Sequence, residues 1–188
     1  MSVIVLLDGS PETSAACSFA IALAQTTNRN LIAQAVIDRN AVMSLTGYSG
    51  YAGLCGSGVF LEAYHGIVKT LSELNESLLM SLTARAEGYG VKVNSHIDVG
   101  GVQEMLAARL EQQDSILVLA DSDWSARMVD LLRFDGPAIL VAAEQGIARK
   151  ITIIANDSWT TRLQTIMASY LPAVSSNSQQ PSLTSMAA

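Results

Sequence analysis

The feature that most constrains the fold is an abrupt change from an apolar run to helical spacing near the N-terminus. Residues Val3–Leu7 are all apolar, and the run stops at Asp8-Gly9-Ser10-Pro11-Glu12. Small and apolar residues then recur at helical intervals as far as Ala24. A continuous apolar strand is typical of a parallel sheet that helices cover on both faces. We therefore expect an α/β fold with Asp8 at the carboxyl end of the first strand, where open α/β sheets bind ligands.

A shorter copy of this pattern returns near the C-terminus. The apolar run Ile151–Ala155 ends in Asn156-Asp157-Ser158, and helical spacing follows over Trp159–Leu171. We predict a complete α/β unit over residues 1–143 and a partial repeat of one strand and one helix over 144–171, which a linker at Ala143–Lys150 introduces. Residues 172–188 are uncharged and aperiodic, which predicts a disordered tail. An exposed Ile151–Ala155 strand would promote aggregation, so we expect it to pair with a sheet edge, in the same chain or across a dimer.

The residues between these two segments alternate between strand and helix patterns. A long connection, 38–60, contains the glycine-rich loop 47–58 and leads into an amphipathic helix over 61–86. Gly88-Tyr89-Gly90 ends this helix by supplying left-handed backbone geometry. Another short helix opens at Gly100-Gly101. The five strands predicted for the unit are Val3–Leu7, Leu31–Ile37, Val91–Ile97, Ser115–Ala120 and Pro137–Ala142.

Composition excludes several classes of protein. The 188 residues carry 11 basic and 17 acidic side chains, a net charge of −6, which argues against nucleic-acid binding. Cys17 and Cys55 form no CxxC pair, and reduced thiols of this kind are typical of the cytoplasm. The apolar run at the N-terminus is too short for a signal peptide, and no apolar stretch approaches the roughly 20 residues that span a bilayer. We expect a soluble, cytoplasmic protein with no membrane or nucleic-acid partner.

The order of these elements, with Asp-Gly-Ser after the first strand and a glycine-led helix after the third, resembles the universal stress protein (UspA-like) family over roughly residues 2–143. The resemblance implies an adenine-nucleotide alpha-hydrolase-like, three-layer α/β fold with strand order 3-2-1-4-5. It also implies a homodimer formed through the last strand and, in many members, ATP binding. Asp8 matches the family's acidic residue near the adenosine, and Val36 matches the position whose backbone meets the adenine.

The chain departs from the family after the fourth strand. ATP-binding members carry a glycine-rich signature there, whose backbone N–H groups hold the phosphates. This chain has Ala120-Asp121-Ser122-Asp123-Trp124-Ser125-Ala126-Arg127 instead, with no glycine before Gly136. Asp121 and Asp123 would repel a triphosphate, and Arg127 offers one compensating charge. The usual phosphate site is therefore expected to be missing.

Other candidate residues have simpler interpretations. Asp8, Asp121 and Asp123 could converge to hold Mg²⁺, but an aspartate that caps the next helix explains the latter two as well. His65 and His96 have no partners at ligand spacing, Ser10 is expected to cap the first helix, and Cys55 has no basic neighbour to activate it. The glycine-rich loop is either a lid or partner-binding element or, as its composition favours, a tolerated insertion.

These observations lead to three hypotheses about function. The first is a non-enzymatic regulatory or stress-response module that acts through dimerisation or an unknown protein partner. The second is a nucleotide sensor that binds ATP or AMP weakly in the crevice between strands one and four, through Asp8 and Val36. The third is a weak nucleotide hydrolase, for which no catalytic constellation is present in the sequence.

Overall fold

The computed structural model describes residues 2–46, 57–110, 115–122, 125, 136–144, 147–155, 161–166 and 182–186. Its strands are β1 (Ser2–Leu7), β2 (Asn30–Asp38), β3 (Val93–Gly100), β4 (Ser115–Ala120), β5 (Ala138–Glu144), β6 (Ile147–Ile154) and β7 (Ser182–Met186). Its helices are α1 (Thr13–Thr27), α2 (Arg39–Leu45), α3 (Ser57–Gly88) and α4 (Val102–Leu110).

The described strands form one sheet in the order β3-β2-β1-β4-β5-β6-β7. Strands β1 to β5 run parallel to one another, and the predicted order 3-2-1-4-5 is confirmed. All six residues of β1 and all six of β4 are buried, as expected for central strands covered on both faces. The strand order reverses between β1 and β4, which places the ligand-binding crevice expected of such a sheet at their carboxyl ends.

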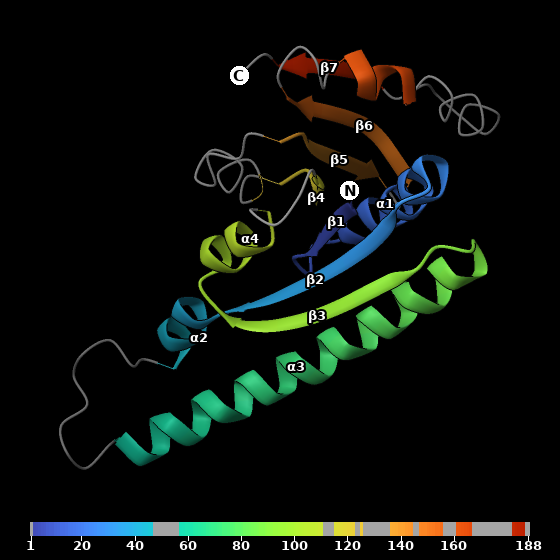
Figure 1. Cartoon of the computed structure of the whole chain (residues 1–188). Helices are drawn as coiled ribbons and strands as arrows, with labels where there is room; N and C mark the ends of the chain where they lie inside the picture. The colour runs from blue at the N-terminus through green and yellow to red at the C-terminus, as the bar shows by residue number, and fades with distance from the viewer. Residues whose placement is uncertain are drawn as a thin grey trace.

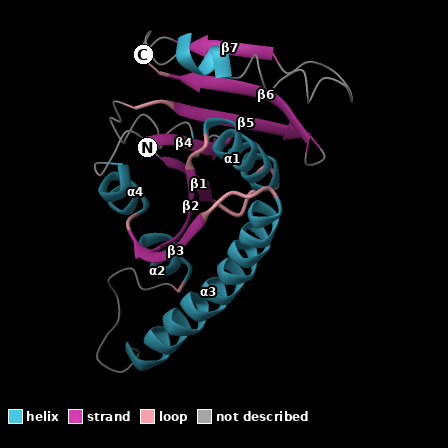
Figure 2. Ribbon diagram, turned by 45° about the vertical axis from the view of Figure 1, so that its right-hand side comes forward, coloured by secondary structure: helices cyan, strands magenta, loops and turns pink. Residues whose placement is uncertain are grey.

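Helices cover both faces of this sheet. Helices α1 and α3 lie on one side and α4 on the other (Figure 2). The larger core cluster joins the α1 side chains, such as Phe19, to Leu79 and Leu82 of α3 and to one face of the sheet. The smaller cluster packs Val102, Leu106 and Leu110 of α4 against the opposite face. The chain therefore has the three-layer α/β architecture that its strand and helix patterns predict.

The C-terminal repeat pairs with the sheet of its own chain. Strand β6 lies antiparallel to β5, with a bulge between Ala142 and Ala143, and β7 lies parallel to β6 (Figure 1). The two side chains Ile151 and Ile153 are each 2% exposed in the larger core cluster. The apolar strand thus covers the edge of β5, which answers whether it pairs within the chain or across a dimer.

Two segments near this end differ from the sequence-based expectations. Residues predicted as a linker belong to β5 up to Glu144 and to β6 from Ile147, because pairing between strands, which local composition does not report, organises them. Residues Ser182–Met186 form β7 within the stretch predicted as a disordered tail. Of the helix predicted over Trp159–Leu171, the structure describes a helical segment at 161–166.

Candidate functional site at the carboxyl ends of β1 and β2

A cavity of about 470 Å³ lies at the carboxyl ends of β1 and β2, and Ser122, which follows β4, borders it on the side of the crevice between strands one and four. Its size falls within the range of about 300–1,000 Å³ that is usual for small-molecule sites. The beginning of α4 and the segment that follows β4 complete the wall. The described residues that line it are Leu6, Leu7, Asp8, Gly9, Ser10, Val36, Asp38, Ala41, Val102 and Ser122.

Asp8 holds the turn that opens this cavity. Its Oδ1 atom accepts a hydrogen bond from the Ser10 backbone N–H at 3.0 Å and another from the Thr13 hydroxyl at 2.5 Å. Gly9, between them, has a φ of +75°, a conformation that glycine adopts without strain. Both of these bonds end on Oδ1, and no hydrogen bond from another described residue ends on the second carboxylate oxygen, Oδ2.

Ser10 does not have the role predicted for it. Helix α1 begins at Thr13 with Glu12 as its N-cap residue, and no side chain bonds to the first-turn amides at that position. The Ser10 hydroxyl instead lies 3.2 Å from the Thr13 hydroxyl, and Ser10 accepts the Thr13 N–H through its backbone carbonyl. The turn before Thr13 is thus organised by Asp8, whose side chain accepts the backbone N–H two residues further along the chain.

Val36 and Asp38 form the wall that β2 contributes. Val36 is half-buried, packs against the smaller core cluster and lines the cavity. Asp38 caps α2 by accepting the Asn40 and Ala41 N–H groups at 2.8 Å and 3.3 Å on its Oδ1 atom. Sequence reasoning missed Asp38 as a site residue, although an aspartate directly after a strand and before a helix is a detectable signal.

The charge of the cavity is the property that limits its ligands. Two carboxylates, those of Asp8 and Asp38, line it, and the described lining residues include no lysine, arginine or histidine. Ser122, after β4, bonds to Ser125 through its hydroxyl at 3.0 Å. Asp121 precedes it and donates its backbone N–H to Val141. Asp123 and Arg127 lie outside the described residues, so neither the magnesium alternative nor the compensating charge of Arg127 is tested.

A buried amide lies directly beside the cavity floor. Gln34 is fully buried and is the register partner of the cavity-lining Leu6. Its Nε2 atom donates to Asp98 Oδ2 at 2.8 Å and to the Ala35 carbonyl at 3.2 Å, which ties β2 to β3. Its Oε1 atom has no hydrogen-bond partner among the described residues. No sequence motif marks Gln34, because only the register of the sheet brings Asp98 to its side.

The remaining candidates lie away from the cavity. Burial raises the pKa of the Cys17 thiol to about 11, against a smaller lowering by Arg85, so this cysteine is not activated. His65 is exposed on α3 and its ring meets that of Tyr64 edge-on, with centroids 5.7 Å apart. His96 is half-buried on β3. The described residues contain no group of three potential metal ligands. Cys55 and most of the glycine-rich loop 47–58 fall outside them.

None of the described helices is apolar enough, over a sufficient length, to cross a bilayer.

No protein-family model matches the chain, and no curated protein matches it in sequence.

Solved structures, in contrast, match it well. The hypothetical protein MJ0577 superposes with a TM-score of 0.56 at 17% identity, over 76% of this chain and 96% of its own. UspA of Lactobacillus plantarum superposes with a TM-score of 0.51 at 16% identity, over 76% and 97% of the two chains. A universal stress family protein of Burkholderia pseudomallei superposes with a TM-score of 0.50 at 23% identity, over 76% and 96%. Three-quarters of this chain therefore has the fold of the universal stress proteins, with their adenine-nucleotide alpha-hydrolase-like sheet.

Proposed function

We propose that the chain is a non-enzymatic regulatory protein of the universal stress type that senses an adenine nucleoside or its monophosphate. The observation that carries this proposal is the 470 Å³ cavity, which Asp8 and Val36 line from neighbouring strands. The family resemblance assigns the adenosine contact to the same two residues. Asp8 directly follows β1, one of the two strands between which the strand order reverses, and ligands bind at this point in sheets of this type.

The lining suits the nucleoside part of such a ligand. Apolar side chains from β1, β2 and α4 offer surface to a purine ring. The Oδ2 atom of Asp8 is a suitable acceptor for a ribose hydroxyl, since the oxygens of an ionised carboxylate accept hydrogen bonds from hydroxyl groups. A hydrogen bond to a charged acceptor contributes about 1.5–3 kcal/mol.

The same lining opposes a polyphosphate. A phosphate charge about 8 Å from either carboxylate meets a repulsion of roughly 2 kcal/mol at an effective dielectric constant near 20, and salt screens it further. With no cation among the described lining residues to offset this, each added phosphate weakens binding. We therefore place adenosine and AMP ahead of ATP as ligands.

Isothermal titration of the full chain with adenosine, AMP and ATP, after removal of any retained nucleotide, tests the proposal. We expect adenosine and AMP to bind at least tenfold more tightly than magnesium-free ATP. Asp8→Asn keeps the side-chain size but removes the charge, and should weaken adenosine binding about tenfold or more. Asp38→Asn should narrow the gap between AMP and ATP.

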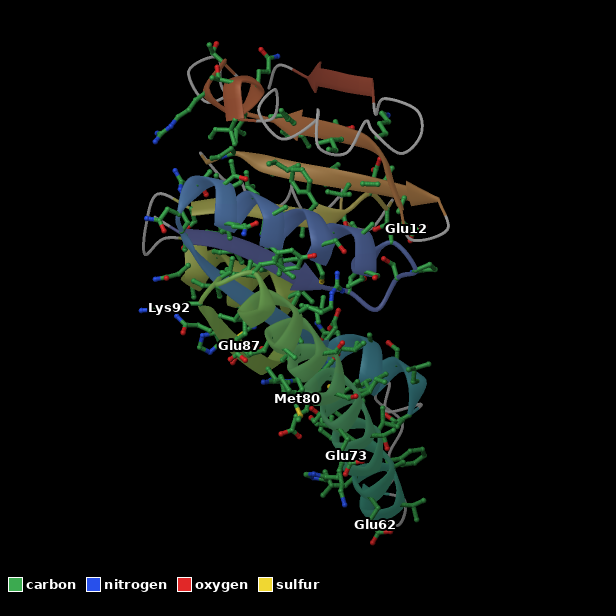
Figure 3. All side chains as sticks on the ribbon, turned by 90° about the vertical axis from the view of Figure 1, so that its right-hand side faces the viewer. Glu12, Glu62, Glu73, Met80, Glu87 and Lys92 are labelled. Atoms are coloured by element: carbon green, nitrogen blue, oxygen red, sulfur yellow. The ribbon has the colours of Figure 1, made fainter. Side chains whose placement is uncertain are left out.

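Glu87→Gln is the matched control, because Glu87 lies on the exposed face of α3 (Figure 3). It removes the same charge without touching the cavity and should leave all three affinities unchanged. Absence of adenosine binding, or an Asp8→Asn variant with the affinity of the original chain, would refute the proposed site. Hydrolysis of ATP by the purified chain would refute the non-enzymatic part.

A further inference from the structure

Helix α3 carries an apolar stripe that the fold covers only in part. Six large side chains follow one another at intervals of four and three residues, the spacing of a coiled-coil core. Leu74 is 56% exposed and Leu78 is 39% exposed, and the other four are half-buried. This α3 stripe consists of Phe60, Tyr64, Ile67, Leu71, Leu74 and Leu78.

The stripe differs from the face with which α3 packs on the sheet. Leu79, Leu82 and Ala86, near the C-terminal end of α3, are the side chains buried in the larger core cluster. At about 100° per residue, their direction lies roughly a quarter-turn from the stripe. The N-terminal part of α3 diverges from the sheet, as Figure 1 shows, so the stripe is not a continuation of the core.

Charged residues of this part of α3 lie on the opposite side from the stripe. Glu62, Glu73 and Met80 follow one side of the helix in Figure 3. Lys69 belongs to this side and forms an ion pair with Glu73 at 3.9 Å within the helix. The positions directly flanking the stripe are uncharged on both sides: Leu61, Val68 and Asn75 on one, Ala63, Thr70 and Ser77 on the other. A second copy of the stripe would therefore meet no like charge.

The two ends of the stripe differ in shape. A cavity of about 230 Å³ lies at its N-terminal end, lined by Phe60, Leu61 and Tyr64 of α3 and by Arg39 and Met43 of α2. The C-terminal end presents the protruding Leu74 and Leu78. Because one end offers a hollow and the other offers side chains to fill it, two copies fit best when they run antiparallel.

We propose that two copies of this chain associate through the α3 stripe as an antiparallel helix pair centred on Lys69. Positions at equal distances from Lys69 then face each other, which pairs Phe60 with Leu78, Tyr64 with Leu74 and Ile67 with Leu71. The contact repeats itself under a two-fold axis, as expected of a homodimer. It also leaves the sheet edge at β5 to this chain's own β6.

The expected affinity follows from the size of the contact. The stripe spans 18 helical steps, about 27 Å. An interface made of six side chains per copy is small compared with a standard protein–protein interface, which buries roughly 800 Å² of surface on each partner. We therefore expect a micromolar dimer in exchange with monomer. Nucleotide binding plays no part in this contact, so the association is independent of the proposed function.

Sedimentation velocity of the full chain over a hundredfold range of micromolar concentration tests the association. Leu74→Lys places two charges in the contact and should weaken dimerisation at least a hundredfold. Met80→Lys is the matched control, because Met80 is an apolar residue that is even more exposed than Leu74 (68%) and lies on the charged side of the same helix. It should leave the dimer unchanged. A monomer at all concentrations, or a dimer that survives Leu74→Lys, overturns the proposal.

Cysteine cross-linking tests the antiparallel direction. In a Cys55→Ser background, the double variant Tyr64→Cys, Leu74→Cys should form a covalent dimer on mild oxidation, because these positions face each other. Each single variant should not, since the same residue lies far from its copy in the antiparallel pair. Cross-linking of the Leu74→Cys single variant would indicate a parallel pair and refute the arrangement. Thermal unfolding of each variant confirms that the fold is retained.

Discussion

Replacing Leu163 by alanine measures whether the C-terminal segment is part of the folded unit. Leu163 lies in the helical segment 161–166, is fully buried, and belongs to the larger core cluster. The substitution removes three carbon atoms, which at about 0.8 kcal/mol each lose about 2.4 kcal/mol of transfer free energy. A residual cavity adds to this, so we expect a loss of about 3–4 kcal/mol in the free energy of unfolding.

Urea unfolding followed by circular dichroism provides the assay. The midpoint should fall while the dependence on urea keeps its slope, because the segment unfolds together with the sheet. Gln164→Ala is the control: its side chain is exposed next to Leu163, so the midpoint should hardly move. A loss below about 1 kcal/mol for Leu163→Ala would refute the reasoning, and a separate early transition would show that the segment unfolds independently.

Three further predictions concern the polar and titratable groups of the fold. Because the pKa of Cys17 is raised to about 11 by burial, the free energy of unfolding should fall between pH 9 and 11, where only the unfolded thiol ionises. Measured by urea unfolding, the fall in the free energy of unfolding over this pH range should be about 2–3 kcal/mol larger for the original chain than for Cys17→Ala. An equal fall in both proteins would contradict the prediction. Gln34→Leu removes an unpartnered oxygen together with the hydrogen bond to Asp98, so the free energy of unfolding should change by less than about 1 kcal/mol. Gln34→Ala also leaves a cavity and should lower the free energy of unfolding by more than about 2 kcal/mol. Equal losses for the two variants in thermal unfolding would contradict this prediction. Asp38→Ala removes the cap of α2 and should cost about 1 kcal/mol, measured by urea unfolding, and an unchanged midpoint would show that the cap is dispensable.

Local patterns were sufficient for the elements that carry the site. The apolar run at Val3–Leu7 predicted a buried strand, and the structure places Asp8 at its carboxyl end beside the cavity. The amphipathic spacing after residue 61 predicted α3, and Gly90 has the left-handed φ of +72° expected after it. The strand order came from the resemblance, and the sheet of this chain confirms it for β1 to β5. The buried strand and the amphipathic helix could be predicted because each depends on residues near each other in the chain, whose periodicity reflects burial directly.

The sequence by itself thus determined the α/β class, the strand that bears Asp8 and the amphipathic character of α3. Only the tertiary structure decided that Asp38 joins Asp8 at the cavity, that Gln34 reaches Asp98, and that β6 lies antiparallel to β5. The physical reason is that strand pairing is made by backbone hydrogen bonds, which are alike for every residue except proline and leave little trace in the sequence. Which strands meet, and therefore which side chains share a site, is settled by the packing of the whole chain.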